Sequence, residues 1–233
     1  MKFDNNYIKP FEEEKMEIFC TYNEKGNLIG QGKINDVFGE LLCEGTFAIA
    51  PKDGKKSISY LVSGVFYIDG QRYEVLNFDG KNGNGCVVSA YTALVPCMEV
   101  KVGYFVNGLL EGNGVTIDNV ATYTKGTFKQ DRFYSGMRSA RRGTRDEVLE
   151  EYEYFDGKTA KGTITYPSDH EIVKGEFRFD LLLFVKGRLE SMTNNGEYFE
   201  GEFHYYNGWK FSSGHGKWKG FEGEINDNTS TKK

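Results

Sequence analysis

The feature that most constrains this chain is a short motif, a glycine followed two places later by an aromatic residue, which returns along most of its length. The most complete unit begins at Gly103, with an aromatic residue at +2 and glycines at +5, +9 and +11, and the motif returns 23 residues later at Gly126. Recurrence at such a period is typical of repeat proteins, in which one unit is too short to fold alone. The repeat positions are Gly45, Phe47, Gly64, Phe66, Gly103, Phe105, Gly108, Gly112, Gly114, Gly126, Phe128, Gly175, Phe177, Gly201, Phe203, Gly214, Gly216 and Gly223.

The spacing within the motif is that of a β-strand. Residues two apart in a strand point to the same face, so each glycine shares a face with the aromatic residue that follows it. We expect the glycine to leave room for a ring of a neighbouring unit, and other glycines to supply the positive φ angles of tight turns. About 23 residues accommodate one hairpin, which is marginally stable alone. The pattern predicts an all-β fold, an elongated and twisted antiparallel sheet of consecutive β-hairpins added in sequence order, with roughly sixteen strands.

Composition agrees with this prediction and limits the partners. Glycine supplies 29 of 233 residues, aromatic residues 15 %, and there are only four prolines, which favours strands and turns over helices. The net charge of −5 argues against nucleic acid and disfavours anionic membranes as partners. Residues 1–20 form a polar leader unlike a signal peptide, and 227–233 a flexible polar tail. We expect a cytoplasmic protein with one repeat array over residues 21–226.

The repeating unit resembles the MORN repeat. Residues 103–114 match that family's spacing of glycines and aromatic residues, 156–167 are similar to the second half of its unit, and 198–203 to the first half. The family's histidine before the glycine doublet is replaced by Glu111 and Ser213, while His215 lies between the two glycines. The resemblance implies stacked β-hairpins that serve as a structural or docking module.

One interval, residues 138–152, departs from the pattern. A basic segment is followed by an acidic one, and Thr144 with Glu147 could cap a short helix. A short helix or loop insertion is one interpretation, and a strand that keeps the 23-residue register is the other. The basic side chains could bind a phosphoinositide headgroup or a small phosphorylated molecule, or pair with the acidic residues that follow. They are Arg138, Arg141, Arg142 and Arg145.

The residues that usually carry catalysis or bind metals are sparse. After each glycine doublet the third glycine of a phosphate-binding loop is replaced, and no nucleophile elbow is present. The histidines are His170, His204 and His215, too far apart in sequence for a metal motif, although His204 and His215 could face each other across a hairpin. The four cysteines lack a Cys-x-x-Cys spacing, so free thiols are favoured over a disulfide. We expect no enzyme activity, no metal and no cofactor.

The leading functional hypothesis is a non-catalytic scaffold for protein–protein interaction. Its partner would be another protein, with a homodimer through the unpaired sheet edges as a further possibility. The alternative is a ligand-binding module that uses the arginine cluster. Aromatic residues that the core does not need would form the interaction surface. The candidates are Tyr104, Tyr205, Tyr206 and Trp209.

Overall fold

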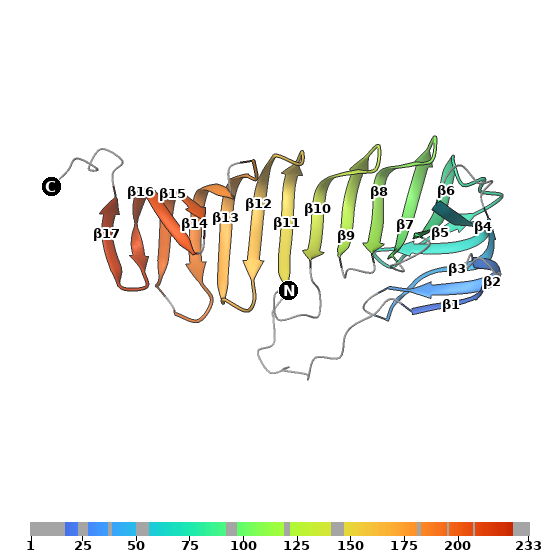
Figure 1. Ribbon diagram of the computed structural model, residues 1–233, viewed down its shortest axis with the longest axis horizontal. Helices are drawn as coiled ribbons and strands as arrows, with labels where there is room; N and C mark the ends of the chain where they lie inside the picture. The colour runs from blue at the N-terminus through green and yellow to red at the C-terminus, as the bar shows by residue number, and fades with distance from the viewer. Residues whose placement is uncertain are drawn as a thin grey trace.

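The computed structural model describes residues 17–22, 28–36, 39–49, 56–91, 97–118, 122–140, 147–180, 183–194, 196–206 and 208–225. These residues contain 17 strands in one antiparallel sheet and no helix (Figure 1). The strands are β1 (Glu17–Tyr22), β2 (Leu28–Asn35), β3 (Leu41–Ile49), β4 (Lys56–Ile68), β5 (Gln71–Val75), β6 (Gly83–Tyr91), β7 (Cys97–Val106), β8 (Leu109–Asp118), β9 (Tyr123–Lys129), β10 (Arg132–Ala140), β11 (Val148–Phe155), β12 (Thr159–Tyr166), β13 (Glu171–Arg178), β14 (Phe184–Ser191), β15 (Tyr198–Tyr205), β16 (Trp209–Trp218) and β17 (Phe221–Ile225).

The strands pair in sequence order with one exception. β4 pairs with β5 through residues 64–68 and with β6 through residues 56–60. All other pairings join strands that are consecutive in sequence, and β5 and β6 do not pair with each other. The predicted all-β sheet of consecutive hairpins is therefore confirmed.

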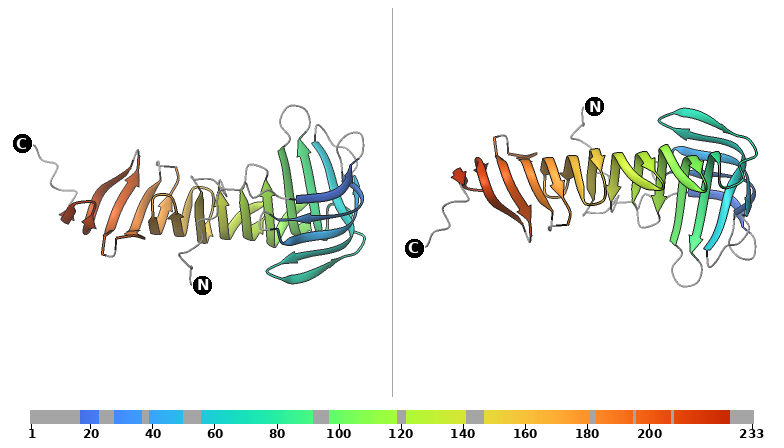
Figure 2. Two further views of the ribbon diagram at one scale, coloured as in Figure 1. Left: turned by 90° about the horizontal axis from the view of Figure 1, so that it is seen from below. Right: turned by 90° about the horizontal axis from the view of Figure 1, so that it is seen from above.

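The sheet has a curl at one end and a long ladder at the other. β1–β6 wrap around one end of the molecule, with β1–β3 running crosswise to β7–β9 (Figures 1 and 2). The curl brings the turn after β4 against β9, where Asp69 and Lys125 form an ion pair. β7–β17 continue away from the curl as a twisted ladder.

Two clusters of buried side chains follow from this shape. The first fills the curl and includes Phe47, Phe66, Val102 and Ile117. The second lies along one face of β11–β17, and in β12–β15 and β17 the residues two before and two after the glycine are apolar. In β15, for example, Phe199 and Phe203 flank Gly201 and both are 0 % exposed. Phe133 packs against both clusters.

A row of glycines runs across the ladder, and its role differs from the expected one. Neighbouring strands place glycines directly opposite each other, as Gly175 and Gly187 do. A Cβ at Gly187 would overlap the carbonyl oxygen of Lys174 and lie 2.7 Å from the Cα of Gly175. The row thus permits close approach of neighbouring backbones. The expected role, leaving room for a ring, is seen at Gly85, which is covered by the ring of Phe78. Its members in β6–β16 are Gly85, Gly103, Gly114, Gly126, Gly136, Gly162, Gly175, Gly187, Gly201 and Gly214.

The described residues of the interval 138–152 belong to strands, apart from Glu147. Arg138 belongs to β10, and Val148 to Tyr152 belong to β11, so the strand alternative holds there and the proposed helix would be confined to 141–146, outside the described residues. Residues 1–16 of the predicted leader 1–20 and the predicted tail 227–233 also lie outside them, whereas residues 17–20 belong to β1. β11 keeps the register, with Tyr152 in the place of the row glycine, between Gly136 and Gly162.

Candidate functional site on the glycine face

The face of the ladder that carries the row glycines, called here the glycine face, changes from apolar to polar halfway along. In the C-terminal strands, the directly opposed residues that lie two positions from the row glycines are apolar and nearly fully buried. They form a row of Ile164, Val173, Leu189 and Phe199. Directly opposed residues in a sheet point to the same face, so the row continues through the register pairs of β7–β11. There it consists of polar side chains, called the polar row: Lys101, Thr116, Thr124, Arg138 and Glu150.

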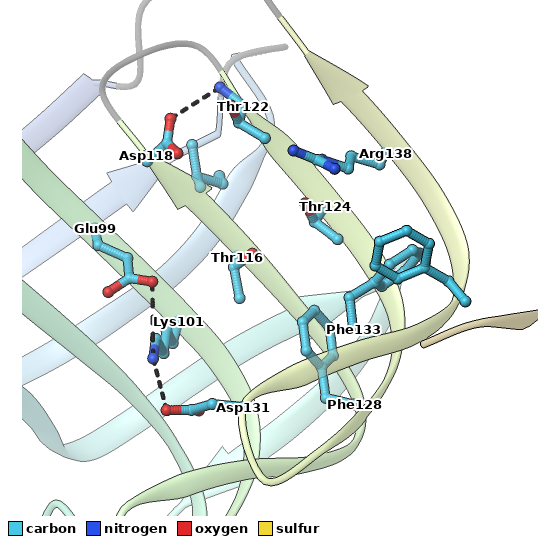
Figure 3. A pocket seen from close by; sticks show the side chains of 12 residues that line it. Glu99, Lys101, Thr116, Asp118, Thr122, Thr124, Phe128, Asp131, Phe133 and Arg138 are labelled. Carbon is cyan, nitrogen blue, oxygen red and sulfur yellow. Dashed lines mark hydrogen bonds and ion pairs between the residues drawn. The ribbon is translucent and has the colours of Figure 1, made fainter. Parts of the chain in front are cut away.

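Four members of the polar row, Lys101, Thr116, Thr124 and Arg138, line a cavity of about 210 Å³. On its other side stands an aromatic wall of Phe128, Phe133 and Phe155, whose neighbouring rings are 5.9 Å apart between centroids. Figure 3 shows the side chains projecting from β7–β10 toward the viewer, while strands of the N-terminal curl lie behind them. The curl therefore covers one face of β7–β9, and the cavity opens on the other.

Lys101 is held in place within this cavity. Its Nζ lies 2.8 Å from Asp131 Oδ2 and 3.7 Å from Glu99 Oε1. Asp131 comes from the β9–β10 turn and also accepts a hydrogen bond from the Leu110 backbone N–H at 2.7 Å. The Lys101 charge is thus balanced by two carboxylates, and it serves mainly to fasten the turn to β7 and β8.

Arg138 is more loosely held. Its guanidinium lies 3.6 Å from Glu150 Oε2, and that oxygen is buried and makes no hydrogen bond. Burial raises the pKa of the Glu150 carboxyl, although the charge of Arg138 opposes the rise. The Arg138 side chain remains 39 % exposed and borders the cavity. A partly exposed guanidinium beside threonine hydroxyls can bind an anionic or hydroxylated ligand.

The structure places only part of the predicted arginine cluster. Arg138 pairs with Glu150. Pairing with the acidic segment that follows was one of the two interpretations of the basic residues. Arg141, Arg142 and Arg145 lie outside the described residues. The cavity was not predicted from sequence, yet a signal exists. In four successive strands, β7–β10, the residue two places from the row glycine is polar, whereas β12–β15 carry an apolar residue there.

Three of the four candidate interface aromatics lie together. Tyr205 and Trp209 meet edge to face at 5.0 Å between centroids, and Tyr206 follows in the same hairpin. Trp209 is half-buried, and its Nε1–H donates to Glu171, whose other oxygen accepts from Lys219. Tyr104 is separate from this group, in β7 near the β7–β8 turn.

Histidines and cysteines form no catalytic or metal-binding group in the described part of the chain. His204 lies opposite Lys210 and His215 opposite Glu200, so the two histidines do not face each other as the sequence allowed. No set of three His, Cys, Asp or Glu side chains that could hold a metal ion occurs among the described residues. Cys43 and Cys86 are reduced thiols that form no disulfide with each other; they are buried in the curl with their sulfurs 3.3 Å apart.

The described strands define a β-hairpin repeat protein. No protein-family model matches the chain, and no curated protein matches it. Among the described residues there is no helix long and apolar enough to cross a membrane.

Proposed function

We propose that this protein is a non-catalytic, cytoplasmic docking scaffold built from MORN-like repeats, and that it binds another protein. One observation carries the proposal. Tyr104, Tyr205 and Tyr206 are 51 %, 42 % and 58 % exposed, whereas eight of the described phenylalanines are at most 3 % exposed. Exposed tyrosines combine a large apolar area with a hydrogen-bonding tip, the combination that protein interfaces favour.

The hairpin of Tyr205 and Tyr206 is the best-supported contact surface. Tyr205 packs against Trp209 and lies 6.4 Å from Tyr166, with the two tyrosine rings nearly parallel. Trp209 is anchored by its hydrogen bond to Glu171. Rings held in one orientation lose little conformational freedom on binding, which favours an anchor residue in an interface.

A photo-crosslinking amino acid at position 206 of the full-length protein tests this function. In lysate of the native cell it should capture a small set of proteins, and Tyr205→Ala combined with Tyr104→Ala should reduce that capture at unchanged melting temperature. The same crosslinker at Lys161, an exposed position of the ladder, is the matched control. Equal capture at 206 and 161, or capture indifferent to the alanines, would contradict the proposal.

A second candidate function is binding of a phosphorylated or otherwise anionic small ligand at Arg138. It is favoured by the exposed guanidinium at the edge of the cavity, next to Thr124 and the aromatic wall. Co-sedimentation with vesicles containing phosphoinositides, together with calorimetry using free inositol phosphates, tests it. Binding should weaken in Arg138→Ala, and in the variant that also replaces Arg141, Arg142 and Arg145. Binding that is absent, or unchanged in both variants, removes this candidate.

A further inference from the structure

The cavity between the polar row and the aromatic wall has more negative than positive charge around it. Three carboxylates and two cationic side chains line it, those of Glu99, Asp118, Asp131, Lys101 and Arg138. Lys101 is paired with two of these carboxylates, and Arg138 lies 3.6 Å from the carboxylate of Glu150. A ligand with several negative charges would therefore gain little from the cavity as a whole, and a neutral ligand suits it better.

The polar side chains of the cavity include hydrogen-bond donors and acceptors. Thr116 and Thr124 are directly opposed in β8 and β9, so their hydroxyls lie on the same face. Figure 3 shows them between Lys101 and Phe133. A threonine hydroxyl both donates and accepts, the guanidinium of Arg138 only donates, and an ionised carboxylate only accepts. A ligand that carries several hydroxyl groups can pair with all three kinds, because each hydroxyl is a donor and an acceptor.

The aromatic wall adds an apolar surface beside these groups. Phe133 and Phe155 line the cavity and are half-buried, with ring centroids 5.9 Å apart and ring planes 43° apart. The face of an aromatic ring is electron-rich and attracts C–H groups. A six-membered sugar ring has C–H groups on its faces and hydroxyls around its rim, which matches rings on one side and polar groups on the other. A purely aromatic ligand would leave the polar side chains without partners.

The volume of the cavity limits the ligand to a small molecule. It is about 210 Å³, below the roughly 300–1,000 Å³ of pockets that enclose drug-sized ligands. One sugar ring therefore matches it better than a longer saccharide, whose further units would extend into solvent.

We propose that this cavity binds one neutral hexopyranose ring, either of a free sugar or at the end of a glycan. The ring lies against Phe133 and Phe155, and its hydroxyls pair with the polar row. This site goes beyond the docking function and does not rest on it. It differs from the second candidate function in the charge of the ligand, so one set of ligands separates the two.

Saturation-transfer difference NMR of the full-length protein is the first test, with the methyl glycosides of glucose, galactose and mannose and with inositol hexakisphosphate. At least one glycoside should receive saturation, most strongly at the C–H protons of one ring face, because that face lies against the phenylalanine rings. A disaccharide ending in the same sugar separates the two sources. A site for a free sugar should bind it more weakly than the glycoside, and a site for a glycan end at least as well. Absence of transfer to all three glycosides, or binding of inositol hexakisphosphate alone, overturns the proposal.

Matched substitutions locate the bound sugar, with affinities measured by titration. Phe155→Leu should weaken binding by about threefold or more, because it removes a ring face. Phe179→Leu is its control, since this half-buried ring lies 5.8 Å from Phe155 but does not line the cavity. Thr116→Val, which removes only the hydroxyl, should weaken binding by about two- to tenfold, whereas Thr163→Val, on the opposite face of the ladder, should not.

Melting curves like that of the unaltered protein show that these variants are folded. If Phe155→Leu does not fold, the threonine pair decides alone. Equal affinities in a cavity variant and its folded control overturn the proposal.

Discussion

At the scale of single residues, the glycine row decides how closely the strands of the ladder can approach. Most row glycines face the backbone of the next strand rather than a ring, so any side chain there would push two strands apart. Tyr152 is the informative exception. It occupies the row position of β11, and glycines stand opposite it on both sides, at 136 and 162. One large residue is thus tolerated where both neighbours have no side chain.

Gly187→Ala tests this role. The added Cβ would meet the carbonyl of Lys174 and the Cα of Gly175, which are backbone atoms that cannot rotate away. We expect a loss of about 1–3 kcal/mol in the free energy of unfolding, the usual cost of overpacking. Lys186→Ala, one residue away and exposed, should change it by no more than about 0.5 kcal/mol. Urea denaturation followed by tyrosine fluorescence measures both, and equal effects would contradict a steric role for the row.

Glu150 gives the molecule a predictable pH dependence. Its carboxyl has a pKa raised above the ordinary 4.5, mainly by burial. At pH values between the pKa of Glu150 in the unfolded chain and its pKa in the folded protein, folding is therefore accompanied by uptake of a proton. Stability from this group is therefore complete below the unfolded pKa and is lost as the pH rises through the folded pKa. Glu150→Gln should raise the melting temperature at pH 7 and leave it unchanged at pH 4. A gain of the same size at both pH values would show that ionisation of Glu150 is not the cause.

At the scale of elements, the strands were predictable and their exceptions were not. Strands such as β13, β14 and β15 carry a glycine with apolar or aromatic residues at even spacing, a local pattern that sequence displays directly. The double pairing of β4 depends on its unusual length and on the short β5 folding back on it, which no local pattern records. The polar row leaves a signal in each strand, a polar residue two places from the row position, but its members become neighbours only once the register of five strands is known.

Pairing of β4 with β6 also brings two cysteines together. Cys43 of β3 and Cys86 of β6 are 43 positions apart in sequence, yet their sulfurs are 3.3 Å apart. Treatment with diamide, which takes two electrons and two protons from a pair of thiols, should link these two residues. The closed loop should add about 4 kcal/mol to stability. Non-reducing peptide mapping identifies the link, Cys43→Ser is the control, and a product joining Cys20 or Cys97 instead would contradict this arrangement.

At the scale of the whole molecule, the chain is one sheet with two cores. The first core is closed by the curl, in which strands distant in sequence contact each other. The second core lies on β11–β17, each of which pairs with its neighbours in sequence. The repeating motif predicted the ladder, because the ladder needs only neighbours. It could not predict the curl, which depends on how bulges and twist accumulate over β2–β6.

Because the two cores are joined through few side chains, a destabilising substitution in one core should loosen that core and leave the other unchanged. In a linear array each unit depends mainly on its neighbours. Leu110 belongs to the first core and Leu189 to the second, and both are 0 % exposed. Each change to alanine should cost about 2–5 kcal/mol locally. Hydrogen exchange should then accelerate in β13–β15 for Leu189→Ala and in β7–β9 for Leu110→Ala, with the other half protected as in the unaltered protein. Acceleration spread evenly over both halves in either variant would mean that the sheet opens as one cooperative unit.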